Sequence, residues 1–443
     1  MVAACGSATP SASLTPLDSG NPSGDLPTSS PPAVSLPPAA SPITTATALV
    51  GDKYGRWESA GELVRSPLTL QWPGHPLQTH VVPFGDTALV VGSDNVCTPG
   101  AAWRESVQAQ VWAGGGEPWQ AAPSLPRARD RFGAFSLPDG SVLVVGGLTD
   151  QTGGPKSFRS TYRLEPGATE WARSGDLNSA RSGPAGSVLE DGRILVAGGW
   201  YSDLPDAPPV VVVQSAELFD PETELWSRTG SMVRARVGAG AVTLSDGRVL
   251  VAGGFGGIPS GSEGWSDFAD LLASAEIFDP ATGTFATTGS LPWTASWPSL
   301  VALPGGDALL VSGDRAARFD GATGEWTETP PMNFRPETPP DADWARTVVG
   351  LPGGEVLVAG GTIPVEDPEE GSTKPYSNRA EVYDPVTNGW MEITPMPVGR
   401  VGGSGVRLND GSVLIAGGAG SVGQPGAPSC PAPASEAVRF IPS

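Results

Sequence analysis

The amino-acid sequence predicts an all-β fold, a propeller built from seven four-stranded blades. Three observations lead to this prediction. A short apolar run ending in glycine recurs seven times, a pair of aromatic residues seven positions apart recurs after it, and one such pair is split between the two ends of the chain. Repeats of this kind are typical of folds in which each unit is one blade, because a single unit cannot bury its faces without its neighbours.

The apolar run is expected to be the second strand of each blade. Most copies follow an Asp-Gly pair such as Asp139-Gly140, which is a strong signal for a two-residue hairpin. The runs are continuously apolar rather than alternating, which indicates strands that are covered on both faces by neighbouring blades. The five regular copies are residues 142–147, 194–199, 249–254, 356–361 and 413–418, and the two degenerate copies are residues 88–93 and 308–314.

The aromatic pairs are expected to lie on the third and fourth strands. One pair is incomplete at the C-terminus, where Phe440 has no aromatic partner downstream, whereas Trp57 near the N-terminus has none upstream. We therefore expect the N-terminal segment to supply the fourth strand of the last blade, which closes the ring without a free sheet edge. The other pairs are Trp112/Trp119, Phe219/Trp226, Phe278/Phe285, Phe319/Trp326 and Tyr383/Trp390, with Leu164/Trp171 as a weaker copy.

These motifs, the glycine pair, the downstream aromatic and the Trp, resemble the kelch-repeat family over roughly residues 50–443. The resemblance implies a kelch-type propeller in which the motif residues are structural. The glycines would allow close approach and unusual backbone angles, and the aromatic rings would fill the wedge between blades.

The N-terminal segment indicates export from a bacterial-type cell. Residues 2–6 resemble the lipobox of bacterial lipoproteins, with Cys5 as the lipidated residue, although the charged and apolar parts of a signal peptide do not precede it. A chance cysteine is the alternative. Residues 1–48 read as this remnant and a disordered Pro/Ser/Thr-rich tether, and residues 49–443 as the propeller. We expect an extracytoplasmic protein, lipid-anchored at the cell envelope or secreted.

Composition excludes several classes of partner. The formal net charge is −21, and this disfavours nucleic acid, because phosphate contacts need clustered Lys and Arg. No apolar run approaches the roughly 18 residues that span a bilayer.

Paired histidines and tyrosines of the kind that galactose-oxidase-like copper enzymes need are missing, since the two histidines, His75 and His80, have no tyrosine cluster beside them. We expect a monomer with no cofactor and no metal.

Four arginines recur eleven residues before the hairpin glycine, a register that places them around one mouth of the central channel. The functional interpretation is capture of an anion or carboxylate. The alternative is a repeat-encoded arginine that bonds blade carbonyls and acidic neighbours. The four residues are Arg129, Arg181, Arg236 and Arg400.

Aromatic residues outside the repeat gather in the variable loops, which lie on one face of the propeller, and they predict a ligand groove over blades four to six. Flat rings stack on the apolar side of sugars, and nearby carboxylates accept hydrogen bonds from hydroxyls. The alternative is that the rings hold the long loops in place. The predicted ligand-binding residues are Trp200, Trp265, Phe268, Trp293, Trp297, Trp344, Asp267, Asp270 and Asp343.

Two further cysteines, Cys97 and Cys430, follow the glycines of the first and last blades. Ring closure makes these blades neighbours, so we expect a disulfide that locks the seam in an oxidising compartment. Two surface cysteines too far apart to bond are the alternative.

No motif assigns a catalytic residue. The first hypothesis is a binding or scaffold module that recognises a glycan or a protein through the variable loops. The alternative is a carbohydrate-active enzyme, a lyase, epimerase or hydrolase, with its site at the channel mouth. A structural envelope protein is a third possibility. Buried carboxylates in the channel mouth would favour the enzyme, and an uncharged aromatic rim would favour binding.

Overall fold

The computed structural model describes residues 54–63, 79–93, 107–115, 117–127, 129–149, 156–201, 211–257, 269–333, 346–361, 376–420, 432–433 and 436–443. These residues all belong to one compact unit, residues 46–443. The proposed tether, residues 1–48, lies outside them, and so do Cys5, Cys97 and Cys430. Lipid attachment and the disulfide therefore stay predictions. No helix in the described residues is long and apolar enough to cross a bilayer.

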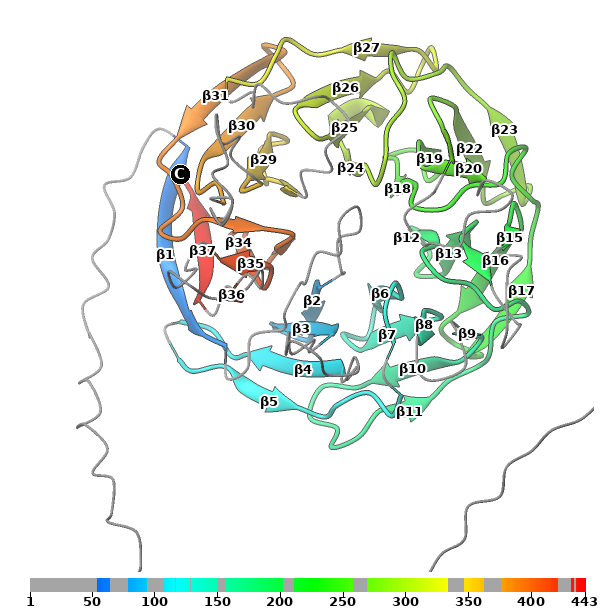
Figure 1. Ribbon diagram of the computed structural model, residues 1–443, viewed down its shortest axis with the longest axis horizontal. Helices are drawn as coiled ribbons and strands as arrows, with labels where there is room; N and C mark the ends of the chain where they lie inside the picture. The colour runs from blue at the N-terminus through cyan, green and yellow to red at the C-terminus, as the bar shows by residue number, and fades with distance from the viewer. Residues whose placement is uncertain are drawn as a thin grey trace, which may run out of the picture. The chain divides into compact units, whose positions relative to one another are not determined.

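The described residues form seven four-stranded antiparallel sheets arranged as blades around a central opening (Figure 1). The first strand of each blade lies nearest the centre, and the fourth forms the outer rim. The predicted fold class is therefore confirmed. Blades 1 to 3 are β2 His80–Phe84, β3 Thr87–Ser93, β4 Val107–Trp112 and β5 Gln120–Ala122; β6 Gly133–Ser136, β7 Val142–Val145, β10 Thr161–Leu164 and β11 Ala172–Arg173; and β12 Ala185–Val188, β13 Ile194–Ala197, β16 Ala216–Asp220 and β17 Leu225–Arg228.

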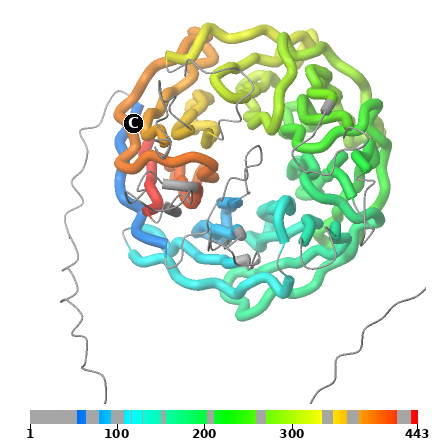
Figure 2. The backbone as a smooth tube through the Cα atoms, viewed as in Figure 1, coloured from blue at the N-terminus to red at the C-terminus, as the bar shows by residue number. Residues whose placement is uncertain are grey.

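Blades 4 to 6 repeat this order along the chain, and blade 7 joins the two ends. In blade 7 the N-terminal strand β1 pairs antiparallel with the C-terminal strand β37, opposing Trp57 to Phe440 (Figure 2). The strands of blades 4 to 7 are β18 Gly240–Thr243, β19 Val249–Ala252, β22 Ala275–Asp279 and β23 Thr284–Thr287; β24 Ser299–Ala302, β25 Ala308–Ser312, β26 Arg315–Phe319 and β27 Trp326–Glu328; β28 Thr347–Gly350, β29 Val356–Ala359, β30 Ala380–Asp384 and β31 Gly389–Ile393; and β33 Ser404–Arg407, β34 Val413–Ala416, β37 Glu436–Pro442 and β1 Gly55–Glu62.

Short ribbons continue the chain beyond the glycine pairs. They lie between the second and third strands of a blade, on the face where the sequence places the variable loops, except that in blade 7 the added strand β32 precedes the first strand. The ribbons are β8 Leu148–Thr149 with β9 Lys156–Ser157, β14 Trp200–Tyr201 with β15 Val211–Val212, β20 Phe255–Gly257 with β21 Ala269–Leu271, and a set of three, β32 Arg400–Val401, β35 Ala419–Gly420 and β36 Ala432–Pro433.

The core lies between the blades, as the continuously apolar strands predict. Every residue of β7, β13, β19, β29 and β34 is buried. The aromatic pairs pack with ring centroids about 5 Å apart, for example 5.1 Å between Phe219 and Trp226 and 5.0 Å between Trp57 and Phe440. Wedge-shaped blades therefore bury their large rings toward the outer rim, where the gap between them is widest.

Candidate functional site

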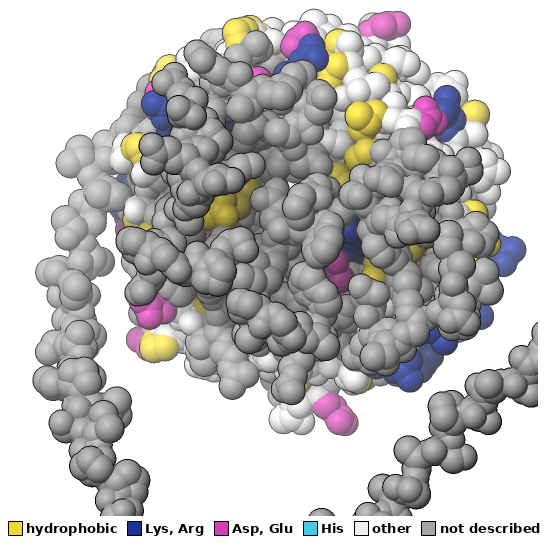
Figure 3. Space-filling view, viewed as in Figure 1, with side chains coloured by type: hydrophobic (Ala, Val, Ile, Leu, Met, Phe, Trp, Pro, Cys, Tyr) yellow, Lys and Arg dark blue, Asp and Glu magenta, His cyan; other side chains and the backbone are white. Residues whose placement is uncertain are grey.

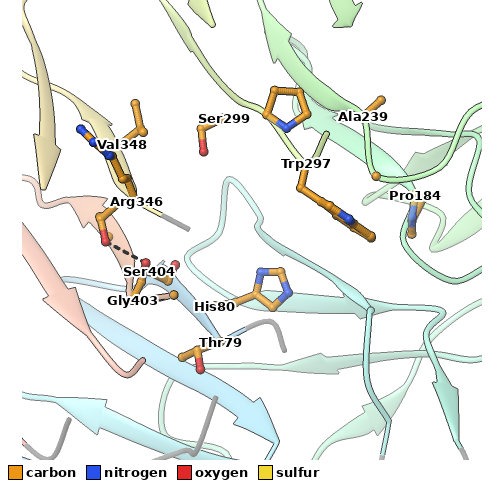
Figure 4. Close-up of a pocket in the computed structure, with 15 residues that line it drawn as sticks. Thr79, His80, Pro184, Ala239, Trp297, Ser299, Arg346, Val348, Gly403 and Ser404 are labelled. Carbon is orange, nitrogen blue, oxygen red and sulfur yellow. Dashed lines mark hydrogen bonds between the residues drawn. The ribbon is translucent and has the colours of Figure 1, made fainter. Parts of the chain in front are cut away.

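A cavity of about 290 Å³ opens at the mouth of the channel, where the chain enters the first strands of the blades (Figure 4). Six of the seven blades contribute to its lining. Each of these blades contributes residues from the same part of its repeat, at the entry to its first strand. A residue that differs from the repeat at this position therefore changes the lining of the pocket directly. The lining residues are Thr79, His80, Pro184, Gly238, Ala239, Trp297, Pro298, Ser299, Arg346, Thr347, Val348, Gly402, Gly403, Ser404 and Gly405.

Trp297 is the largest departure from the repeat in this pocket. It lies two residues before the first strand of blade 5, the register that glycine occupies in blades 3, 4 and 7 as Gly183, Gly238 and Gly402. Those glycines have φ values of 59°, 64° and 70°, and Trp297 has a φ of 42°. A bulky side chain in this left-handed region is rare and strained, and strain of this kind concentrates at functional sites.

The Trp297 ring lies over the glycines of the neighbouring blades. A Cβ atom added to Gly238 would come within 2.9 Å of the indole, and one added to Gly183 within 3.4 Å. On its other side the ring is 6.4 Å from the Phe255 ring, centroid to centroid. Its buried Nε1 has no hydrogen-bond acceptor in the described part of the chain. The indole is thus held flat in the channel mouth with part of its surface open.

His80, at the start of β2, faces the same pocket beside Trp297 (Figure 4). Its ring packs against Phe132, with centroids 4.9 Å apart. Burial lowers the pKa of His80 to about 4, so the imidazole is neutral at physiological pH. The buried Nε2 atom has no hydrogen-bond partner among the described residues.

The other polar groups of the pocket are mostly hydroxyls. The Ser404 Oγ accepts a hydrogen bond from the Val81 amide at 3.0 Å, and Thr347 Oγ1 donates to the Gly403 carbonyl oxygen at 2.7 Å. Thr79 and Ser299 complete the set. No carboxylate is among the described lining residues, and their one cation is Arg346. The pocket therefore offers aromatic surface and neutral hydrogen-bonding groups rather than a pair of acids for catalysis.

Arg346 contributes its charge within blade 6. Burial lowers its pKa, while Glu381 and Asp314 raise it, and its Nη1 lies 3.2 Å from the Met332 sulfur. In blades 3 and 4 the arginine next to the corresponding glutamate is the repeat arginine, Arg181 or Arg236. The sequence pattern missed Arg346, because Asp343 occupies the repeat register in blade 6 and the arginine comes three residues later.

The four repeat arginines are buried to at least 99%. Each donates to the carbonyl oxygen of the first glycine of its blade's pair, as Arg181 does to Gly198 at 2.8 Å. Arg181 and Arg236 also form ion pairs of 2.7 Å with Glu217 and Glu276. Their donors are directed into the blades, which favours the structural alternative over capture of an anion, and we propose no ligand role for them. The equivalent carbonyl bonds run from Arg129 to Gly146, from Arg236 to Gly253 and from Arg400 to Gly417.

Of the predicted ligand-binding residues that the structure describes, only Trp297 lines the channel pocket. Trp200 is fully buried in a cluster with Leu148, Val237 and Phe255, so it holds the ribbons together as the alternative expects. Trp293 is half-buried with the Arg315 guanidinium 4.0 Å above its ring, and Asp270 pairs with Arg234. The remaining predicted residues, Trp265, Asp267, Phe268, Asp343 and Trp344, lie outside the described part of the chain.

Seven antiparallel blades with a pocket at the channel mouth define a β-propeller. The family model described as "Kelch motif" matches residues 344–397, which span the start of blade 6 to its last strand. The motif match, the kelch-repeat relatives and the seven-bladed fold together support assignment to the kelch-repeat β-propellers. This confirms the resemblance inferred from the glycine pairs and aromatic residues.

Relatives with curated names fall into two groups. The chain is 23% identical over 231 residues to an N-acetylneuraminate epimerase of Brucella melitensis, covering 43% of this chain and 59% of the relative. It is 24% identical over 280 residues to Kelch-like protein 25 of Xenopus tropicalis, covering 62% of this chain and 42% of the relative. The chain thus spans less than two thirds of the length of either protein.

A solved structure with a similar fold is a fungal alcohol oxidase of the AA5 family in complex with copper. The TM-score is 0.60 at 18% identity, and the match covers 89% of this chain and 77% of the oxidase. A likeness this distant concerns the fold alone. In the part of the chain that the structure describes, no group of three His, Cys, Asp or Glu side chains is placed to hold a metal ion.

Proposed function

We propose that the protein is a binding module that recognises a carbohydrate at the channel mouth, with Trp297 as the stacking surface. The observation that carries this proposal is the substitution of glycine by Trp297 at a left-handed position facing the pocket. The strained Trp297 ring packs against the cluster of Trp200, Val237 and Phe255, yet blades 3, 4 and 7 are built with glycine at this position. Its cost is explained if the ring contributes to ligand binding.

The chemistry of the pocket supports a sugar. An indole face stacks on the apolar side of a pyranose ring, while its Nε1 can donate to a hydroxyl. Hydroxyls of Thr79, Ser299 and Ser404 can both donate and accept. The neutral imidazole of His80 adds one more polar group without placing a charge against the uncharged sugar ring. The epimerase relative, which is named for a sugar acid, adds independent support for a carbohydrate ligand.

An enzyme acting on a sugar is the second candidate, and one observation favours it. His80 is neutral and its Nε2 has no partner among the described residues, so it could accept a proton as a general base. The described lining residues lack the carboxylate pair that hydrolysis of a glycosidic bond generally uses. A binding module therefore accounts for more of the pocket than an enzyme does.

A glycan array probed with the wild-type protein and with Trp297→Gly tests the proposal. We expect a small set of glycans to bind the wild type and to lose at least tenfold in signal with the variant. Binding that is equal for both proteins would contradict the proposal, as would a screen in which no glycan binds. For the second candidate, His80→Gln should abolish turnover of a bound sugar and leave its affinity nearly unchanged.

We also propose that the protein works outside the cytoplasm, tethered through Cys5. The motif at residues 2–6 and the Pro/Ser/Thr-rich segment after it support this location. Metabolic labelling with a palmitate analogue tests it: label on the wild type and none on Cys5→Ser is expected, and no label on either would contradict it.

A further inference from the structure

A second cavity, of about 670 Å³, lies between blades 2 and 3, away from the channel pocket. We call it the blade 2/3 groove. Its lining is unusual for a chain with a net charge of −21, because it contains four cations and one carboxylate. In the space-filling view, Lys and Arg side chains gather on the rim beside β11 and β17, at the lower right (Figure 3). The charged residues of the groove are Arg127, Lys156, Arg159, Arg173 and Asp176.

Three of these cations have no carboxylate at ion-pair distance within the described ranges. Arg173 pairs with Asp176 at 2.8 Å. Arg127, Lys156 and Arg159 take part in no ion pair between described residues. All three are exposed. Among the described residues, the groove therefore has a local excess of positive charge.

The excess has a specific origin in the repeat. In blades 3, 4 and 6 the residue opposite the third position of the central strand is a glutamate, Glu217, Glu276 or Glu381. In blade 2 that residue is Tyr162, opposite Val144. Blade 2 therefore lacks the carboxylate that blades 3 and 4 place beside their buried arginines.

The missing glutamate has two consequences in blade 2. Elsewhere it accepts hydrogen bonds from main-chain amides of the preceding loop, for example from Asn178 and Ser179 to Glu217 at 2.6 and 3.0 Å. In blade 2 the position equivalent to Asn178 is Pro126, which has no N–H. In addition, the buried Arg129 lies over the rings of Phe158 and Tyr162, at 4.8 and 4.9 Å, with no carboxylate beside it.

Arg129 remains a cation under these conditions. Burial is the main cause that lowers its pKa to about 10; Tyr162 raises the pKa, and the charges of Arg127 and Arg173 lower it. It is therefore protonated at neutral pH, directly behind the Phe158 and Tyr162 side chains that line the groove. Its charge adds to the positive potential that the three exposed cations create.

We propose that the blade 2/3 groove binds an acidic carbohydrate, one that carries two or more carboxylate or sulfate groups. Arg side chains form forked, charge-assisted hydrogen bonds with both groups. Tyr162 and Tyr201 offer ring surface and hydroxyls for the sugar units between the charges. The proposal takes only the class of ligand, a carbohydrate, from the proposed function. The preference for an acidic ligand rests on the cations of the groove and does not depend on the channel pocket.

Isothermal titration at 50 mM salt tests the groove with three probes: a galacturonate trisaccharide, a sulfated heparin tetrasaccharide and neutral maltotriose. We expect at least one acidic probe to bind the wild type and maltotriose not to bind this site. Arg127→Gln/Lys156→Gln should weaken the acidic probe at least tenfold. The matched control is Arg228→Gln/Arg234→Gln, which removes two exposed cations from the corresponding region of blades 3 and 4, where Arg234 is paired with Asp270.

A third variant restores the repeat. Tyr162→Glu places a carboxylate in blade 2 and should also weaken binding of the acidic probe at least tenfold. Because this substitution alters the core, the exposed double variant Arg127→Gln/Lys156→Gln serves as a check that leaves the core unchanged. Preference for galacturonate or for heparin identifies the recognised group, and either supports the proposal. Equal affinity in the wild type and Arg127→Gln/Lys156→Gln would overturn it, as would no binding of either acidic probe. A loss caused by Trp297→Gly would place the acidic ligand in the channel and would also overturn it.

Discussion

The Trp57 Nε1 atom donates a hydrogen bond to the main-chain carbonyl oxygen of Thr394 at 2.7 Å, across 337 residues of sequence. The same bond recurs between blades that follow one another in the chain. Trp119 donates to Ala60 at 2.9 Å, and Trp171 donates to Pro123 at 2.7 Å. The N-terminal strand therefore makes, with the preceding blade 6, the same contact that Trp119 and Trp171 make with the blades before theirs.

The seam predicts a large stability effect at Trp57. Trp57→Ala removes a fully buried indole and its hydrogen bond from the core between blades 6 and 7. We expect a loss of about 3–5 kcal/mol in the free energy of unfolding, since the rigid blades cannot close the cavity. Denaturant unfolding measures it, with Val386→Ala, at a position 92% exposed, as the control. A Trp57→Ala protein as stable as the control would show that the N-terminal strand does not close the ring.

The buried ion pairs predict a second stability effect. Glu276→Gln leaves the Arg236 guanidinium buried without its counter-ion, which we expect to cost about 3–5 kcal/mol. The exposed pair Arg315–Glu328 provides the control, because Glu328→Gln should cost about 1 kcal/mol or less. Equal effects of the two variants in thermal or denaturant unfolding would contradict the structural role assigned to the repeat arginines.

His80 predicts a dependence of stability on pH. Its pKa is about 4 in the folded protein against 6.5 for the ordinary side chain, so between these values the unfolded state binds the proton and the folded state does not. Stability conferred by the neutral imidazole is complete above pH 6.5 and falls as the pH drops toward 4, by about 3 kcal/mol at most. Unfolding of the wild type and His80→Gln at pH 7 and pH 4.5 isolates this contribution. Parallel curves for the two proteins would refute it.

A substitution at Gly238 tests how closely the Trp297 ring packs on this glycine. Gly238→Ala places a Cβ atom at positive φ and 2.9 Å from the indole, so we expect a loss of stability larger than the roughly 1 kcal/mol of backbone strain alone. Gly167→Ala is the matched control, because Gly167 also has positive φ but has nothing within 4 Å. In a Trp297→Gly background the extra cost should disappear. An extra cost that persists there would show that the ring does not rest on Gly238.

The architecture could be predicted from the sequence, because the same motif recurs in every blade and a degenerate copy can be recognised by its spacing from the regular ones. The central strands, the hairpins and the split Trp57/Phe440 pair follow from spacing alone. The groove over blades four to six stays a prediction, because several of its residues lie outside the described part of the chain. Exposure of a loop Trp depends on what the ribbons cover, and this is why Trp200, predicted to contact ligand, is buried.

The two proposed sites share a signal that a stricter alignment of the repeats would have revealed. Trp297 stands where blades 3, 4 and 7 have glycine, and Tyr162 stands where blades 3, 4 and 6 have glutamate. Arg346 could not be found in this way, because it lies one residue before β28 and not at the position of the repeat arginines, which Asp343 occupies in blade 6.

Trp297→Gly tests the central claim most directly, because it restores the repeat residue while it deletes the proposed binding surface. Glycine relieves the left-handed strain, which offsets part of the packing lost with the ring. For the glycan that the wild type binds most tightly, we expect at least a tenfold loss of affinity by calorimetry, partly recovered in Trp297→Phe, with a melting temperature within a few degrees of wild type. Unchanged affinity, or a fall in melting temperature as large as that of Trp57→Ala, would contradict the claim.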